Sequence, residues 1–542
     1  MKLPSMKYAD KIRKTKQVRF GGLSHYIGAE DGGIWDMQNM TSDHAPVLAT
    51  REKRYLYRKL EAPGGIYAWD KLCWVDGGKF YYDGVEKGEV SPGVKSFAAM
   101  GAYILILPDK RYYNIDTDAF GELEAQWSGE SLTFGHGLLY EEAAEANTIS
   151  CEGVDWAQFF KAGDAVTISG CSKYPGNNKT IIIRQVSGDK LFFYEYSFTL
   201  DGEAGDQAYQ ETGTLTIRRK VPDLKYCCEN ENRLWGCSDT AIYASKQGDI
   251  FNWEVYDGLE SDAYAVEPGS TGYFTGCISY RGYPVFFKEE QIYKVYGSQP
   301  SNFEVVGSAT LGLAEGSGGS LAIAGETLFY LSRSGIMAYT GGIPQSIGKA
   351  FGPEHFRDAV AGADGLKYYV SMRGDDGCRR LYVYDTQRGT WHVEDQIHAT
   401  HFAYCGGALY CLNDRGEIWI LGNPQEKPEG AAREPDVEWM VEWCDFTEDS
   451  PNKKGLGKLQ IRLSLDAGAE LKAWMQFDSD GQWRLVKVLE GEDPKRSYYL
   501  PLVPRRCDHY RLKLTGTGGC KIYSLVREVY AGSEMKSYPG RN

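Results

Sequence analysis

Hydrophobic and polar positions along the chain follow the pattern of short β-strands. Apolar residues at helical spacing do not recur over any 15-residue window, apart from residues 155–160, which predict one short helix. Alternating and β-rich runs fill the rest, as at residues 72–75, 328–331 and 381–384. The sequence therefore predicts an all-β fold.

These strands recur as paired units, each made of an apolar strand, a short turn and a second strand that ends in a polar glycine-bearing turn. The units begin near Ile66, Phe97, Tyr226, Cys277, Leu321, Lys367 and Phe402. From Tyr226 onward their spacings are about 51, 44, 46 and 35 residues, as in propeller blades. Because a single hairpin cannot bury both of its faces, we expect the units to stack. The prediction is a β-propeller of about seven blades, spanning residues 61–124 and 222–424.

Two stretches interrupt the period, and each predicts a further β domain. Residues 125–221 hold their own set of strands, which predicts a small inserted domain resembling a β-barrel. After the linker at residues 422–430, residues 432–535 hold seven short strands, which predict a C-terminal β-sandwich. Residues 21–60 are predicted to be an extended lead-in segment to the propeller.

The first 20 residues form a basic N-terminal arm, with seven lysines and arginines against one acid. One interpretation is a frayed, solvated terminus. The other is an arm that docks on an acidic partner subunit. Its candidate docking residues are Lys11, Arg13, Lys14, Lys16 and Arg19. The segment lacks the apolar stretch of a secretory signal.

Charge and composition narrow the classes of function. The chain has 542 residues and a formal charge of −14, so its body is not expected to grip duplex DNA. The longest apolar run, around residues 103–107, is far shorter than the roughly 20 residues that span a bilayer, so we expect no membrane insertion. The 13 scattered cysteines predict reduced thiols in a protein made in a cytoplasm.

No catalytic motif is recognisable in the sequence. The nucleophile elbow, the phosphate-binding loop and the zinc-protease helix are missing. In the one histidine cluster, His392, His398 and His401, only His398 and His401 could meet on a metal, if a turn brought their rings together, and no third ligand is evident nearby. The acidic pair Asp375-Asp376 could serve a glycosidase, but its flanking glycines favour a β-turn. We therefore expect no enzymatic activity, no cofactor and no metal site.

Two passages resemble phage tail proteins. Gly32-Gly-Ile-Trp-Asp-Met-Gln-Asn-Met40, followed by Pro46-Val-Leu-Ala-Thr-Arg51, resembles the start of tail hub or nozzle proteins, where such a segment runs into a β-propeller. Asn232-Arg-Leu-Trp-Gly-Cys-Ser238, with the stretch from Ile242 to Trp253, resembles a blade that recurs in phage and prophage tail proteins.

The resemblance implies a structural protein of a short-tailed phage virion: a tail hub, a nozzle or a head-to-tail adaptor, assembled in the bacterial host cytoplasm. In that family, propeller subunits form a homo-oligomeric ring, here expected to be a hexamer, around an axial channel. The implied partners are other copies of the chain, tail, adaptor or portal proteins, and translocating DNA in transient non-specific contact. An acidic channel wall would let DNA slide, so we expect a net negative one. Two alternatives remain: a receptor- or glycan-binding tail protein, and a propeller glycoside hydrolase.

Overall fold

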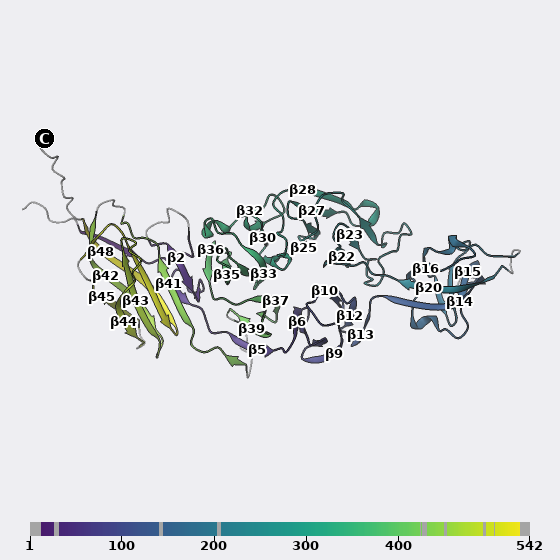
Figure 1. Cartoon of the computed structure of the whole chain (residues 1–542), viewed down its shortest axis with the longest axis horizontal. Helices are drawn as coiled ribbons and strands as arrows, with labels where there is room; N and C mark the ends of the chain where they lie inside the picture. The colour runs from purple at the N-terminus through teal and green to yellow at the C-terminus, as the bar shows by residue number, and fades with distance from the viewer. Residues whose placement is uncertain are drawn as a thin grey trace, which may run out of the picture. The chain divides into compact units, whose positions relative to one another are not determined.

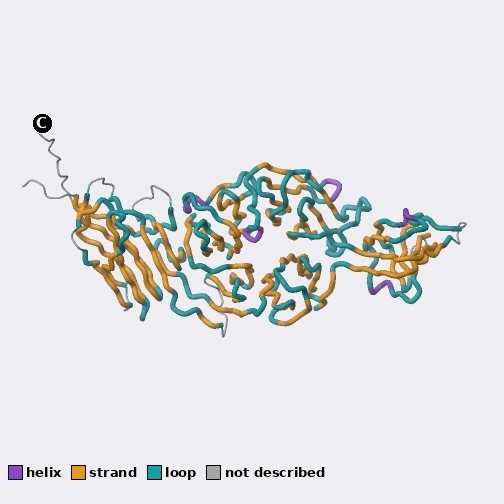
Figure 2. Tube along the Cα trace, in the orientation of Figure 1, coloured by secondary structure: helices purple, strands orange, loops and turns teal. Residues whose placement is uncertain are grey.

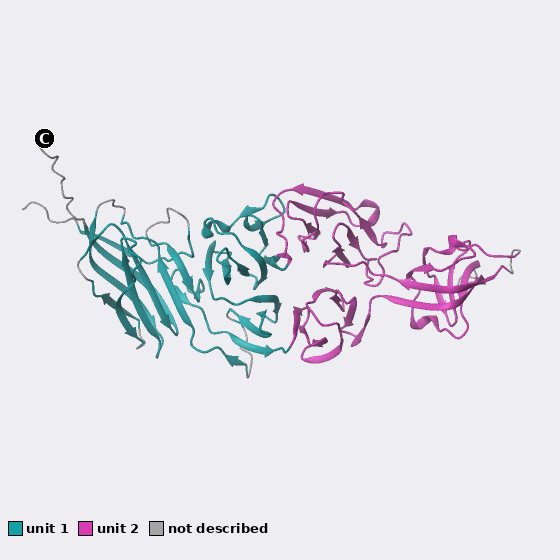
Figure 3. Ribbon diagram, in the orientation of Figure 1, with its two compact units in different colours: residues 1–61, 319–542 teal, residues 62–318 magenta. Residues whose placement is uncertain are grey.

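The computed structural model describes residues 12–25, 32–139, 145–202, 207–422, 424, 431–448, 453–491, 495–502 and 505–531. Their regular structure is almost entirely β-strand (Figure 2). The helical segments in these ranges are 3-10 turns: η1 (Trp156–Gln158), η2 (Pro175–Asn177), η3 (Pro300–Asn302), η4 (Gly318–Ser320) and η5 (Gly348–Phe351). No helix of the described ranges is long and apolar enough to cross a membrane. The chain divides into two compact units, residues 1–61 with 319–542 (unit 1) and residues 62–318 (unit 2) (Figure 3).

Unit 2 contains four antiparallel sheets of four strands, each paired in chain order (Figure 1). The first two are β6 (Pro63–Ala68), β7 (Leu72–Asp76), β8 (Lys79–Tyr82), β9 (Val85–Glu89), then β10 (Ser96–Met100), β11 (Tyr103–Leu107), β12 (Arg111–Asn114), β13 (Ala119–Glu122). The other two are β21 (Tyr226–Asn230), β22 (Arg233–Cys237), β23 (Ile242–Ala244), β24 (Tyr264–Val266), then β25 (Gly276–Tyr280), β26 (Tyr283–Phe287), β27 (Gln291–Tyr296), β28 (Glu304–Ala309). Tight turns such as Glu231-Asn232, with φ of 52° and 57°, match the twist of the strands that they join.

Consecutive sheets of unit 2 pack face to face, as propeller blades do. Phe80 of the first sheet shares a core with Ile104 of the second. Leu105 in turn packs with Leu234 of the third. These side chains are fully buried, so each blade covers an apolar face that a lone hairpin would expose to water.

The inserted domain of unit 2 is one seven-stranded sheet in the order β17-β16-β20-β14-β15-β19-β18. Its strands are β14 (Ala125–Leu138), β15 (Glu145–Ser150), β16 (Ala165–Ser169), β17 (Thr180–Ile182), β18 (Gln185–Ser187), β19 (Lys190–Tyr194) and β20 (Tyr209–Arg219). The two edge strands, β17 and β18, are joined by only residues 183–184, so the sheet curls into a barrel-like form. A buried aromatic core that includes Phe134, Trp156 and Phe193 fills it.

Unit 1 contains three further blades. Two are β29 (Ala322–Ala324), β30 (Thr327–Ser332), β31 (Gly335–Tyr339), β32 (Gln345–Ser346), and β33 (Arg357–Ala363), β34 (Lys367–Arg373), β35 (Arg379–Asp385), β36 (Thr390–Val393). The last is β37 (Ala399–Cys405), β38 (Ala408–Asn413), β39 (Glu417–Leu421) and β5 (Tyr55–Lys59), with the short β40 (Ala432–Arg433) beyond. An N-terminal strand thus completes the blade that ends the repeat.

The rest of unit 1 is a sandwich of two antiparallel sheets around one shared core. One sheet holds β3 (Met40–Thr41), β4 (Leu48–Thr50), β48 (Cys520–Ala531), β42 (Lys454–Leu465) and β45 (Arg496–Leu500), with β1 (Ile12–Gln17) on β48 and β46 (Arg506–Cys507) on β42. The other holds β2 (Ile34–Gln38), β41 (Glu438–Trp443), β47 (Tyr510–Thr517), β43 (Glu470–Phe477) and β44 (Arg484–Glu490).

The predicted fold class is confirmed: an all-β chain with seven propeller blades, an inserted barrel-like domain and a C-terminal sandwich. The sixth blade begins at Arg357, ten residues before the predicted Lys367, because the small residues of β33 give a weak apolar signal. The N-terminal region differs from the predicted arm and extended lead-in. Strands β1 to β4 belong to the sandwich, and Ile34, Met37 and Met40 lie buried in its core.

Candidate functional site

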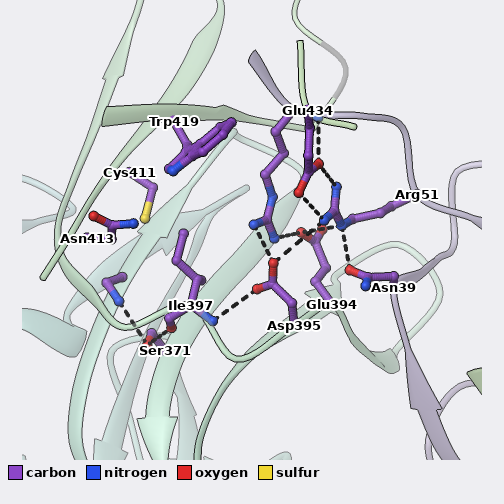
Figure 4. A network of polar contacts seen from close by, with 12 residues as sticks. Asn39, Arg51, Ser371, Glu394, Asp395, Ile397, Cys411, Asn413, Trp419 and Glu434 are labelled. Carbon is purple, nitrogen blue, oxygen red and sulfur yellow. Dashed lines mark hydrogen bonds and ion pairs between the residues drawn. The ribbon is translucent and has the colours of Figure 1, made fainter. Parts of the chain in front are cut away.

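The first family-like passage ends in a buried network of polar side chains in unit 1 (Figure 4). Asn39 has a φ of 56°, a left-handed conformation that asparagine adopts more readily than most residues. Its Oδ1 accepts a hydrogen bond of 2.7 Å from Arg51 Nε, and its Nδ2 donates one of 2.8 Å to the Glu438 carbonyl. The asparagine and the arginine of the motif are therefore in direct contact, and they tie the lead-in to β41.

Two arginines meet three carboxylates in this network. Arg51 donates to both oxygens of Glu434, at 2.7 and 3.0 Å. Arg54 donates to Asp395 Oδ2 at 2.6 Å and to Glu394 Oε2 at 2.7 Å. Arg54 is only 3% exposed and Glu394 only 5% exposed, so these pairs are taken out of water. We call these five residues the charged junction.

The arginines of the charged junction favour the ionised form of Asp395 and Glu434. Burial alone would raise the pKa of Asp395, but Arg54 and Arg51 outweigh it and lower that pKa below its usual value of 3.8. Burial likewise opposes ionisation of Glu434, and hydrogen bonding to Arg51 lowers its pKa. The pKa of the Arg54 guanidinium is raised by Asp395 and Glu394 against the effect of its burial. For Asp395, Glu434 and Arg54 the shifts therefore all favour the charged form.

The charged junction connects three parts of unit 1. Arg51 and Arg54 follow β4, Glu394 and Asp395 follow β36 of the sixth blade, and Glu434 follows β40 in the segment that leads to the sandwich. Backbone hydrogen bonds connect the same segments: Glu434 N–H donates to the Arg54 carbonyl at 2.9 Å, and Asn39 N–H donates to the Glu394 carbonyl at 2.6 Å. The arrangement is a joint between blade and sandwich.

The second family-like passage forms a joint of the same kind in unit 2. Asn252 Oδ1 accepts from the backbone of Ala165, at 3.0 Å, and its Nδ2 donates to Asp164 Oδ1 at 3.1 Å. Asp164 is fully buried and also pairs with Arg219, which closes the last strand of the inserted domain. The arginine of the passage itself, Arg233, is 2% exposed and donates to backbone carbonyls of the loop at residues 245–262.

Removal of the Asn252 amide should loosen the inserted domain. Asn252→Ala leaves Asp164 and the Ala165 N–H short of a buried partner, a cost of about 1–2 kcal/mol. Limited proteolysis should then cut near residues 125 and 219 faster than in the parent chain. Asn302→Ala, at an exposed turn of the next blade, is the matched control and should not change the rate. Equal cleavage of Asn252→Ala and the parent would show that this amide does not hold the domain.

The structure separates the predicted arm residues. Lys11 lies outside the described residues, while Arg13 Nη1 donates to the Glu448 carbonyl at 2.9 Å. Lys14 lies 3.3 Å from Glu528, with 69% of its side chain exposed. Lys16 and Arg19 are exposed as well. The arm is therefore held on β48 of its own sandwich, and docking on a partner stays a prediction.

The candidate histidines do not come together as metal ligands in the described part of the chain. His392 is buried in β36, where burial first and Lys367 second lower its pKa to about 4. His398 Nδ1 instead lies 3.0 Å from Asp414 Oδ2. His401 Nδ1 lies 3.3 Å from the Thr400 hydroxyl.

The acidic pair lies in the turn between β34 and β35, as the glycines indicate. Asp375 accepts from the backbone of His355, and Asp376 accepts from Cys378 N and from Arg380. Both pKa values are lowered, chiefly by the His355 backbone for Asp375 and by Arg380 for Asp376. Since a glycosidase acid needs a raised pKa, this pair does not supply one.

Two carboxyl groups with raised pKa values escaped the sequence analysis. Burial is the main cause both for Asp36, in β2, and for Glu354, after η5. His25 and Arg380 lie near both groups and partly oppose the shift. Asp36 stands inside the first family-like passage at an exposed position of β2, and the nearby Glu442 carboxylate adds to the rise in its pKa. Neither group lines a cavity that would admit a substrate among those found in the described residues.

Comparison with known proteins adds little. No family model and no curated protein matches the chain. Among solved structures, BamB from Moraxella catarrhalis matches with a TM-score of 0.34 and 12% identity, over 70% of this chain and 99% of that one. The exo-β-1,3-galactanase Pc1,3Gal43A from Phanerochaete chrysosporium matches with a TM-score of 0.19 and 9% identity, over 54% and 92%. Scores this low carry no argument about function.

Proposed function

We propose that this chain is a structural subunit of a phage tail, of the hub, nozzle or adaptor type, which forms a homo-oligomeric ring around the DNA channel. The observation that carries the proposal is the role of the two family-like passages. Their polar residues, Asn39 and Arg51 in one and Asn252 and Arg233 in the other, form buried joints that hold an added domain or a long loop to a blade.

Buried joints of this kind suit a part that bears load. Arg51, Arg54 and Glu394 are almost wholly removed from water, and each pairs with a charge from another part of unit 1, so loss of one partner would leave a buried charge without compensation. Catalysis needs the opposite arrangement, in which groups with shifted pKa values face a cavity. The residues of the charged junction form buried ion pairs, as expected for a structural joint.

The N-terminal arm offers a route to partners. Strand β1 pairs only with β48 among the described strands, so its outer edge is open to another chain. Its basic side chains complement a protein of charge −14, such as a second copy of this chain. We place the arm at the contact between neighbouring subunits of the ring.

Charge reversal on the arm tests this assignment. Lys16→Glu and Arg19→Glu, alone and together, should shift the purified chain from rings to smaller species in light scattering, because they replace attraction by repulsion. The thermal midpoint should stay within about 2 °C, as expected for exposed surface positions. Lys190→Glu, an exposed lysine of the inserted domain, is the control and should assemble like the parent. Unchanged assembly of the double variant would favour a solvated terminus.

A second candidate function is glycan binding by the inserted domain. Tyr194 and Tyr196 are 56% and 87% exposed, and the Arg184 guanidinium stacks on Tyr194 at 3.4 Å. Exposed aromatic rings of this kind can stack on sugar faces. Binding of the full chain to a glycan array, lost in Tyr196→Ser and kept in Tyr256→Ser, would establish it. An array without signal would remove this candidate and leave the structural proposal unaffected.

A further inference from the structure

Three metal-binding side chains meet at one end of the inserted domain. They are His136, Glu145 and Glu195, and one ligand atom from each lies within 4.8 Å of the other two. His136 Nε2 and Glu145 Oε2 are 3.4 Å apart. In a tetrahedral zinc site, bonds of about 2.0 Å place neighbouring ligand atoms about 3.3 Å apart. The observed separation is therefore already close to that of a coordinated pair.

The strand register explains why residues so far apart in sequence share one place. In the β14–β15 pairing, Leu138 stands opposite Glu145, and His136 is two residues from Leu138 on the same face. In the β15–β19 pairing, Ala146 stands opposite Tyr194, so the next pair along the ladder is Glu145 and Glu195. The three ligands thus occupy one face of three adjacent strands.

That face is the inner face of the barrel-like sheet. Two residues before His136 lies Phe134, and two residues before Glu195 lies Phe193; both are fully buried. The centroid of each ring lies 5.1 Å from that of Phe198. The Phe198 N–H donates a hydrogen bond of 2.8 Å to Asn147 Oδ1. The three ligands therefore lie next to packed aromatic rings, which fix the positions of the strands that carry the ligands.

The net negative charge of the cluster favours binding of a cation. Two carboxylates and one imidazole carry a net negative charge whether or not the imidazole is protonated, and carboxylates on adjacent strands repel each other. Imidazole nitrogen together with carboxylate oxygen is a donor set for zinc and its transition-metal neighbours, whereas Ca²⁺ and Mg²⁺ prefer oxygen alone. Three protein ligands would leave a fourth position for water or for a partner's side chain.

We propose that His136, Glu145 and Glu195 bind a divalent transition metal ion, with zinc as the reference ion, and thereby hold β14, β15 and β19 together at this end of the inserted domain. The site differs from the histidine cluster that the sequence singled out, and the proposal departs from the expectation of a chain without a metal site. It does not depend on the phage-tail assignment, since a monomer would contain it too.

Titration of the intact, chelator-stripped chain with zinc tests the proposal. We expect one ion per chain and a rise in the thermal midpoint of the inserted domain. Glu195→Gln should weaken binding at least about 10-fold, and His136→Ala should do the same. His398→Ala, which removes a histidine from an exposed His–Asp pair, is the matched control and should bind like the parent.

Cobalt spectroscopy distinguishes this site from one built on any of the 13 cysteines. Co²⁺ at a site of nitrogen and oxygen ligands shows visible bands without thiolate charge transfer in the near ultraviolet. Equal zinc affinity in Glu195→Gln and the parent, a thiolate band, or Ca²⁺ binding as tight as zinc would each overturn the proposal. Because Glu195→Gln keeps the size of the side chain, its loss of binding would not be a failure to fold, which the metal-free thermal midpoint verifies.

Discussion

Replacement of Arg54 by methionine is expected to lower the free energy of unfolding of unit 1 by about 3–5 kcal/mol. The substitution keeps most of the side-chain volume but removes the guanidinium that lies 2.7 Å from Glu394 and 2.6 Å from Asp395. The nearest remaining guanidinium, that of Arg51, lies 3.8 and 3.6 Å from these carboxylates. Taking one member from a buried ion pair costs more than the pair contributes, because the other charge stays desolvated. Urea unfolding followed by tryptophan fluorescence measures the loss in the transition of unit 1.

Two controls separate this effect from a general sensitivity to arginine loss. Arg54→Lys keeps the charge but lacks the planar guanidinium that donates to both carboxylates at once. We therefore expect an intermediate loss of unfolding free energy. Arg484→Met breaks an exposed pair with Asp480, 2.7 Å long, in the same unit and should cost far less, because water screens an exposed pair. A loss for Arg54→Met no larger than that for Arg484→Met would refute the charged junction as a joint.

The second large effect concerns His392 and pH. Burial lowers the pKa of this side chain from 6.5 to about 4, with Lys367 and Arg388 adding to the shift and Asp385 and Asp43 opposing it. The unfolded chain takes up a proton near pH 6.5, but the folded chain does not until about pH 4. Stability is therefore fully present above pH 6.5 and falls by about 3 kcal/mol as the pH drops to 4.

His392→Gln should remove this slope between pH 6.5 and 4, as measured by urea midpoints at half-unit steps. His355→Gln, at a histidine with 76% of its side chain exposed, should keep the slope of the parent. Below about pH 4 a separate loss is expected, because Asp395 and Glu434 have lowered pKa values and their stabilisation disappears as the pH falls through them. A parent chain with no slope between pH 6.5 and 4 would show that His392 is not held neutral.

The blades could be predicted from sequence because their contacts are local. Each hairpin joins strands a few residues apart, and its turn residues, such as Gly77-Gly78 and Glu231-Asn232, adopt positive φ. The strand periodicity and the turn chemistry therefore lie in one short window. The predicted start was least accurate for the blade that begins at Arg357, because residues 359–363 show little contrast between apolar and polar positions.

The N-terminal strands carried no such signal. Strand β2 pairs with β41, about 400 residues later, and a bulge between Ile34 and Asp36 breaks its alternation. Strand β5 pairs with β39 across more than 350 residues. Partners so distant leave no periodic trace near either strand, so an extended lead-in was the simplest interpretation.

The candidate sites were beyond sequence reasoning for a similar reason. Arg54 and Glu394 are 340 positions apart, and Arg51 and Glu434 are 383 positions apart. His136, Glu145 and Glu195 have no regular spacing, because a hairpin register and a neighbouring strand bring them together. The family-like passages did contain Asn39, Arg51 and Asn252. The sequence identified them only as motif residues and could not indicate which contacts they make.

Cryo-electron microscopy of the purified chain, and of any particle isolated with it, tests the central claim most directly. The account predicts a rotationally symmetric ring of this chain around the tail axis, six-fold, with an acidic wall facing the DNA and β1 at the contact between neighbours. A chain found only as a monomer, or a ring whose lumen is basic and closed to DNA, would contradict it.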